Sequence, residues 1–126
     1  MKGYSFRLGA VLRVRRVETL LAHQRVGMAA RELAAAFARE RDMDNNYEAA
    51  VGVLGEVAGT VFAAKREAGE RLADILAMAV GDRMKRQDHL GQERLGAVRA
   101  ERRVAVLDDF ATVRAAAGAM GAAGVD

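Results

Sequence analysis

The 126-residue chain contains no cysteine, no proline and no tryptophan, and aromatic residues make up only 5% of it. The missing cysteine excludes disulfides and thiolate metal sites, and it is typical of a reducing compartment. The missing proline means that no position forces a helix to kink or stop. The hydrophobic fraction of 52% therefore consists mainly of Ala, Val and Leu, which fill narrow seams between helices rather than a thick globular core.

Long hydrophobic runs are also missing. No run approaches the ~18 consecutive apolar residues of a membrane span. Near the start of the chain, four arginines interrupt the apolar residues that a signal peptide would need: Arg7, Arg13, Arg15 and Arg16. We therefore expect a cytoplasmic protein.

Charge is distributed unevenly along the chain, although the net charge is only +3. Residues 1–41 carry nine basic and three acidic residues, whereas residues 42–60 carry four acidic residues and no basic one. Residues 61–126 are nearly balanced, with eleven basic and ten acidic residues. Such asymmetry bears on the choice of partners and not on the fold.

Apolar residues recur at steps of three and four in both halves, and no segment alternates with period two, so we expect an all-α chain. The mean steps are about 3.6 and 3.7 residues, which predicts a nearly straight or weakly twisted helix pair. In the first half the predicted stripe is Leu8, Leu12, Arg15, Thr19, Ala22, Val26, Ala30, Leu33 and Phe37, widened by Val14, Val17, Leu21 and Met28. In the second half it is Leu72, Leu76, Val80, Met84, Gln87, Gly91, Leu95, Val98, Arg102, Val106, Phe110 and Val113.

Two segments are candidates for the turn between the helices. The segment "DMDNN" (42–46) is rich in turn-forming residues, and "GVLGEVAGT" (52–60) holds three glycines and ends in a good N-cap, Thr60. The second divides the chain into similar halves whose stripes can bury each other. We therefore expect a single helical hairpin over 1–126, a long antiparallel two-helix coiled coil. Its first helix covers about 4–51, the turn about 52–60 and the second helix about 61–117, with a frayed tail over 118–126.

A turn centred near residue 56 sets the residues that face each other. Phe37 should lie near Ile75 and Leu76, and Leu33 near Ala79. Leu12 should lie near Ala100, and Arg13 should face Arg99.

A catalytic, metal or cofactor site is not indicated by any spacing in the chain. His23 and His89 lack the glutamate three residues before them that a di-iron bundle needs, so we expect surface or seam-edge histidines. Asp108 and Asp109 are adjacent and diverge by about 100° on a helix. No phosphate loop is present, because the glycines of 52–59 are not followed by Gly-Lys-Ser/Thr. We expect a non-enzymatic protein without a cofactor.

Six arginines are expected at the end of the hairpin opposite the turn: Arg13, Arg15, Arg16, Arg99, Arg102 and Arg103. They form either a solvated, partly ion-paired surface or a docking surface for an acidic protein partner, since arginine binds carboxylates in bidentate fashion. Nucleic acid is disfavoured, because acids interrupt the basic residues and no aromatic platform accompanies them. A membrane-surface helix would need Trp, Phe or Lys along one face, and only Tyr4 and Phe6 qualify.

Apolar residues also gather around the expected turn, namely Tyr47, Val51, Leu54, Val57 and Phe62. They form either a local cap on the hairpin or a patch for a partner, with Tyr47, Val51 and Phe62 as the candidate contacts.

Two stretches carry a resemblance to a known family. The opening "FRLGAVLRVRRVE" resembles the start of FliJ-type flagellar export proteins, where an F-x-L-x-x-V-L-x-x-R-like run begins the first helix. The stretch "ERLGAVRAERRVAVLDDFATVR" (93–114) is similar to their helix of paired arginines followed by an acidic segment. The intervening residues match in pattern and length, except that Arg66 and Gly69 stand where apolar residues are expected.

The resemblance implies an antiparallel coiled coil similar to the central stalk of rotary ATPases. Proteins of this family associate with the hexameric export ATPase of the type III secretion system, with the membrane export gate protein and with export chaperones. The end bearing both termini is thought to enter the ATPase ring, which would give the six arginines a docking role. Tyr47, Val51 and Phe62 would then lie at the tip that meets the export gate. The protein would be peripheral to the inner membrane through these partners only.

Overall fold

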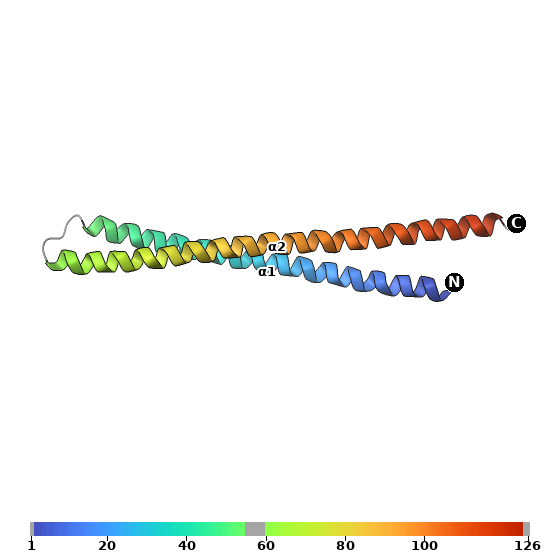
Figure 1. Ribbon diagram of the computed structural model, residues 1–126, viewed down its shortest axis with the longest axis horizontal. Coiled ribbons are helices and arrows are strands. Elements are labelled where there is room, and N and C mark those ends of the chain that lie inside the picture. The colour runs from blue at the N-terminus through green and yellow to red at the C-terminus, as the bar shows by residue number, and fades with distance from the viewer. Residues whose placement is uncertain (1, 55–59, 125–126) are drawn as a thin grey trace. The chain divides into compact units, whose positions relative to one another are not determined.

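The computed structural model describes residues 2–54 and 60–124, and all of them are helical (Figure 1). Helix α1 runs from Lys2–Leu54 and helix α2 from Thr60–Gly124. The all-α expectation is confirmed. Residues 55–59, on which the expected turn falls, lie outside the described residues, as do residues 1, 125 and 126. Side chains are described over 7–52 and 63–121.

The structure excludes one of the two candidate turns and lengthens the expected second helix. Residues 42–46 are helical within α1, so the turn is not at "DMDNN". Helix α2 continues to Gly124, so the tail expected to fray is helical as far as that residue. Each glycine costs about 1 kcal/mol in a helix, but alanine has the highest helix propensity and no proline interrupts the run. The alanines of 115–123 therefore carry the helix past Gly118 and Gly121.

The chain divides into two compact units, and in each of them a segment of α1 packs against a segment of α2. Unit 1 consists of Met1–Gly27 and Gln92–Asp126, and unit 2 consists of Met28–Gly91. In unit 1, Arg16 pairs with Asp108 and His23 with Glu101. In unit 2, Glu32 pairs with Arg86 and Arg39 with Asp82. In each unit, residues that come later in α1 therefore pair with residues that come earlier in α2.

The seam between the helices follows alternating steps of three and four residues, a mean of 3.5 rather than the expected 3.6 to 3.7. On α1 the buried and half-buried positions of unit 1 include Leu8, Leu12, Arg15, Thr19, Ala22 and Val26, and those of unit 2 include Ala29, Leu33, Ala36, Glu40, Met43, Tyr47 and Ala50. On α2 the corresponding positions of unit 2 include Gly69, Leu72, Leu76, Ala79, Arg83, Arg86 and Leu90, and those of unit 1 include Glu93, Ala97, Ala100, Val104, Leu107 and Ala111. A repeat of 3.5 is the period of a left-handed supercoil.

The predicted stripe on α2 is wrong beyond Val80. Its later members are exposed: Met84, Gln87, Gly91, Leu95, Val98, Arg102, Val106, Phe110 and Val113. On α1 the seam likewise uses Ala29 and Ala36 in place of Ala30 and Phe37. At two steps the sequence favours the larger apolar residue, Phe37 and Val98, whereas the helices pack through the neighbouring alanines, Ala36 and Ala97.

The seam is thin because its buried members are small. Within the described part of the chain, the buried hydrophobic side chains are five alanines and Leu90. In unit 1, Ala22 packs with Ala97 and Ala100, and Val26 lies against this cluster. Ala100 therefore lies beside Ala22, whereas the expected register placed it beside Leu12. Alanine permits close approach of two helices but removes little apolar area from water, so each contact stabilises the packing only modestly.

Candidate functional site: an arginine-lined groove in unit 1

Four of the six arginines singled out in the sequence line two adjoining hollows of unit 1. The first hollow, of about 370 Å³, is lined by Arg15, Arg102 and Arg103 together with three apolar residues. The second, of about 360 Å³, is lined by Arg15, Arg99 and Arg103 together with further residues of both helices. Arg15 of α1 and Arg103 of α2 belong to both, so the two hollows form one surface depression, which we call the unit 1 groove.

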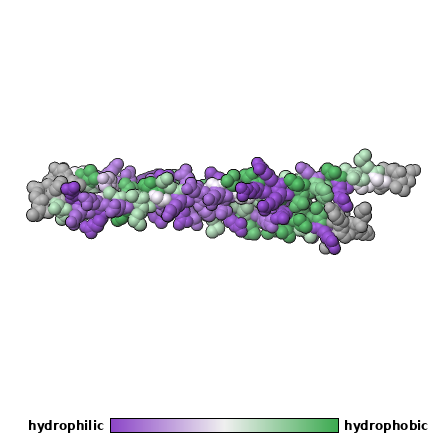
Figure 2. Space-filling view, in the orientation of Figure 1, coloured by the Kyte–Doolittle hydropathy of each residue, from purple (hydrophilic) through white to green (hydrophobic). Residues whose placement is uncertain are grey.

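One end of the unit 1 groove is apolar. Its apolar lining consists of Val11 of α1 and Val106 and Leu107 of α2, beside the side chains of Arg15, Arg102 and Arg103. The apolar surface continues along the helices, because Val14 lies one turn after Val11 and Phe110 one turn after Val106. Val14 and Phe110 are 57% and 45% exposed. Figure 2 shows hydrophobic residues interspersed with hydrophilic ones over the visible face of this unit.

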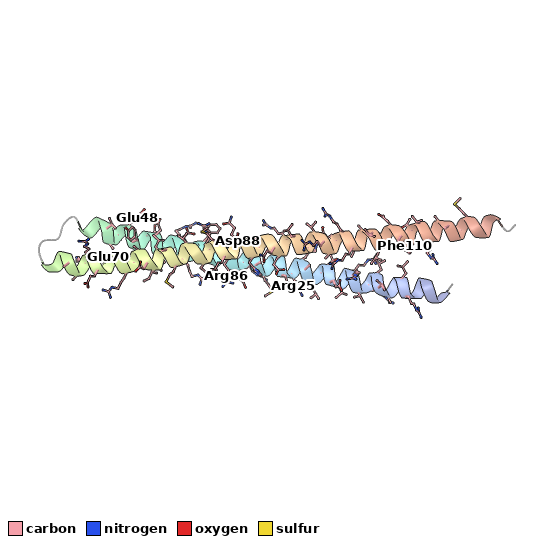
Figure 3. All side chains as sticks on the ribbon, viewed as in Figure 1. Arg25, Glu48, Glu70, Arg86, Asp88 and Phe110 are labelled. Atoms are coloured by element: carbon pink, nitrogen blue, oxygen red, sulfur yellow. The ribbon has the colours of Figure 1, made fainter. Side chains whose placement is uncertain are left out.

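The other end of the groove is charged. Arg25 and Arg99 line it, together with Glu18 and Glu93. Arg25 was not among the residues predicted for this site; it comes from α1, as Figure 3 shows. The floor includes Gly96, which contributes no side chain, and a Cβ placed there meets no atom within 4 Å. The groove is therefore open above the backbone of α2 at this point.

The carboxylates around the groove neutralise only part of its positive charge. Arg15 donates a hydrogen bond from Nη1 to Oε2 of Glu18 at 2.9 Å. No ion pair joins Arg25, Arg99, Arg102 or Arg103 to a carboxylate among the residues that the structure describes. With five arginines and two glutamates in its lining, the groove has an excess of positive charge. Such a surface attracts carboxylates or phosphates.

The remaining two predicted arginines lie elsewhere. Arg16 pairs with Asp108 at 3.6 Å, and neither residue lines the groove. Arg13 is exposed, and it too is absent from the lining of both hollows. The prediction that Arg13 faces Arg99 is wrong, because Arg99 lines the same hollow as Arg25 of α1 and the true register displaces the two helices relative to the expected one.

Of the three predicted tip residues, the structure describes the side chains of Tyr47 and Val51. Tyr47 is half-buried on α1 of unit 2, and Val51 is 45% exposed. The side chain of Phe62 lies outside the described residues. A nearby hollow of unit 2 is lined by Ala49, Ala50, Lys65 and Ala68, and includes neither Tyr47 nor Val51.

Unit 2 contains an ion-pair ladder that the sequence reading missed, formed by Glu32, Arg39, Glu40, Asp82, Arg83 and Arg86. Arg83 donates to both carboxylate oxygens of Glu40, at 2.9 Å from Nε and 3.4 Å from Nη2. Arg39 donates to Asp82 at 3.1 Å and Arg86 to Glu32 at 2.9 Å. Figure 3 labels Arg86 on α2 of this ladder.

The centre of the ladder lies in the seam itself. The side chains of Arg83 and Glu40 are only 24% and 22% exposed. The hydrogen bond to Glu40 raises the pKa of Arg83; burial acts in the opposite direction, and the charge of Glu40 raises the pKa further. The guanidinium also lies 5.4 Å from the centroid of the Phe37 ring, a cation–π arrangement. Phe37 therefore lies beside the seam, against the ion pair. The sequence predicts it in the seam itself.

Metal-binding side chains do not converge in the described residues. No group of three or more His, Cys, Asp or Glu side chains within 2–54 and 60–124 is arranged to hold a metal ion. His23 lies 2.7 Å from Glu101, with both side chains about half exposed. Nor does any described helix combine the length and hydropathy of a membrane-crossing segment.

No protein-family model, no curated protein and no solved structure matches the chain.

Proposed function

We propose that the chain is a non-enzymatic stalk or adaptor of a flagellar type III export apparatus, built as a long antiparallel two-helix coiled coil. The 3.5-residue seam in each unit supports the coiled coil, as do the ion pairs whose order along α2 reverses that along α1. The resemblance of "FRLGAVLRVRRVE" and of 93–114 to FliJ-type proteins supports the export role. The protein would act in the cytoplasm, held at the inner membrane by its partners.

The unit 1 groove is the observation that carries this proposal. It brings together Arg15, Arg99, Arg102 and Arg103, which come from both predicted arginine clusters and from both helices. The unit also contains the segments next to both chain ends, the part that enters the ATPase ring in FliJ-type proteins. Arginines that lack a carboxylate partner within the described chain are available to acidic residues of the ring.

In the proposed mechanism, an asymmetric stalk shifts the conformational equilibrium of individual ring subunits. The groove occupies one side of unit 1, so the subunit facing it experiences a different charge from the others. A ligand shifts a conformational equilibrium only by its different affinity for the two states, and this asymmetry would supply the difference. The export gate and the export chaperones would contact other parts of the chain, with Tyr47, Val51 and Phe62 as the residues proposed for the gate. The stalk itself needs no cofactor.

Charge reversal of three arginines tests the proposal. Arg99→Glu/Arg102→Glu/Arg103→Glu should abolish stimulation of the export ATPase, because it replaces the donors of the groove with acceptors that repel carboxylates. A matched control is Arg31→Glu/Lys85→Glu/Arg94→Glu, which changes the net charge equally at exposed positions outside the groove. ATPase turnover with each variant is the measurement. Stimulation that survives the first variant, or is lost equally with the control, would remove the arginines from the mechanism.

A second function is favoured by the exposed apolar residues of unit 1. Val14, Leu95, Val106 and Val113 are all more than half exposed. A self-associating structural coiled coil without an export role would cover them with a second copy. Sedimentation over a concentration series separates the two functions, since a stalk stays monomeric in the absence of the ring and a self-associating bundle does not.

A further inference from the structure

We infer that the unit 1 groove binds one amphipathic helix of a partner protein, with acidic residues near one end of the helix and apolar residues near the other. The inference deepens the proposed docking role, on which it rests for its biological setting, by naming the chemistry and geometry of the bound segment.

The charged end of the groove determines where the acidic residues of the ligand bind. Arg25 and Arg99 come from opposite helices and line the same hollow as Gly96, so a carboxylate bound in this hollow has arginine donors on both helices. Arg103 adds a third along the same wall. Guanidinium groups bind carboxylates in bidentate fashion, and these hydrogen bonds are stronger than those between neutral groups.

The apolar end sets the other part of the ligand. Val11, Val106 and Leu107 line that hollow beside three arginines, and Phe110 and Val113 continue the apolar surface along α2. Figure 3 labels Phe110 on α2 of this unit. Val106, Phe110 and Val113 recur at steps of four and three, so they form one row on the helix surface. A row of this kind matches the apolar stripe of an amphipathic helix laid along it.

The distance between the two ends fixes the spacing within the ligand. Seven residues separate Arg99 from Val106, which is about 11 Å along a helix at 1.5 Å per residue. A helical ligand spans this distance in about two turns. Its acidic residues should therefore precede or follow its apolar anchors by about two turns.

Other occupants fit the groove less well. A symmetric dimer through this face would place two copies of a groove with five arginines and two glutamates against each other, so two positively charged surfaces would meet. A nucleic acid would bring phosphates to the arginines but would leave Val11, Val106 and Leu107 without an apolar contact. A partner helix with both chemistries uses the whole groove.

The probe is a capped synthetic helix of about 18 residues, or five turns, with glutamates in one half of one face and leucines in the other half. Its control is the same peptide with lysine in place of every glutamate. Fluorescence anisotropy with the full chain should show saturable binding of the acidic peptide, weakening as salt rises, and no binding of the lysine peptide. Equal binding of both peptides, or of neither, would overturn the inference. So would tighter binding of a labelled DNA duplex than of the acidic peptide.

Two variants locate the binding. Arg25→Glu/Arg99→Glu should weaken peptide binding by roughly tenfold or more, since each reversal replaces an attraction with a repulsion. Arg31→Glu/Arg94→Glu, with the same change in net charge at exposed positions outside the groove, should leave it unchanged. Gly96→Leu should also abolish binding, because its side chain fills the open floor while raising helix propensity, so misfolding would not explain the loss. Unaltered binding by Gly96→Leu would place the peptide elsewhere and overturn the inference.

The peptide experiment contains no export ATPase, so the two proposals fail separately. If the chain stimulates the ATPase but does not bind the peptide, only the acidic-helix inference is contradicted. Peptide binding without any engagement of the ATPase would leave the groove chemistry in place and sink the export role.

Discussion

Ala97→Asp should destabilise the packing of α1 on α2 in unit 1 by about 3 kcal/mol, because it buries a carboxylate in a seam without a partner. Ala97 is 5% exposed and packs in the cluster formed with Ala22 and Ala100. Glu93 and Glu101 lie one turn to either side on α2, so the new charge also meets two like charges. Urea denaturation followed by far-UV circular dichroism measures the effect.

Ala105→Asp is the matched control for this substitution. Ala105 lies on the same helix with acidic residues at the same spacings, Glu101 before it and Asp109 after it, but it is exposed. Helix propensity and like-charge repulsion therefore change similarly, and only burial differs. The control should cost about 1 kcal/mol or less. Equal destabilisation by the two substitutions would mean that Ala97 is not in the seam.

Ala22→Cys/Ala100→Cys should form an intramolecular disulfide almost completely under mild oxidation, whereas Leu12→Cys/Ala100→Cys should form none. The chain has no cysteine of its own, so the two new thiols have no competitor. Ala22 and Ala100 pack in one cluster. Leu12 lies ten residues from Ala22, about 15 Å along α1, which exceeds the Cα separation of about 4.4–6.8 Å that a disulfide requires.

Mobility on a non-reducing gel, followed by mass spectrometry of the cross-linked peptides, distinguishes the two registers. A disulfide through Leu12→Cys instead of Ala22→Cys would restore the register expected from a turn centred on residue 56. Cross-linking of both pairs would indicate helices that slide past each other.

Helix content could be predicted from the sequence with little difficulty. The absence of proline, the abundance of alanine, leucine and arginine, and the recurring steps of three and four leave no competing element. The segment "DMDNN" has turn chemistry, but Met43 within it and Tyr47 directly after it occupy seam positions and hold the helix in place. Packing overrode local preference there.

The choice of seam on each helix could not be predicted, because two rows one residue apart compete. Hydropathy favours Phe37 over Ala36 on α1 and Met84 over Arg83 on α2. In the structure Glu40 and Arg83 lie in the seam and satisfy each other, with Phe37 beside them. A charged residue in a seam is tolerated only with its partner, and that partner is 43 residues away in the chain. A slip of either helix by one turn would separate them, so the pair also disfavours other registers.

The α2 side of the candidate site could be predicted from the sequence, whereas the α1 side could not, because it depends on the register of the two helices. The arginines of α2 line the groove as a group, because Arg99, Arg102 and Arg103 share neighbouring turns of one helix. The α1 side depends on the register, so Arg13 and Arg16 lie outside the groove and Arg25 lies in it. The apolar end went unrecognised because Val106 and Phe110 had been assigned to the seam.

Native mass spectrometry of the full chain mixed with the purified export ATPase tests the stalk role most directly. A stalk that occupies the single central hole of a ring predicts one chain per hexamer, with the chain lost when Arg99, Arg102 and Arg103 are reversed in charge. Six chains per hexamer, or a hexamer that never carries this chain, would contradict the role.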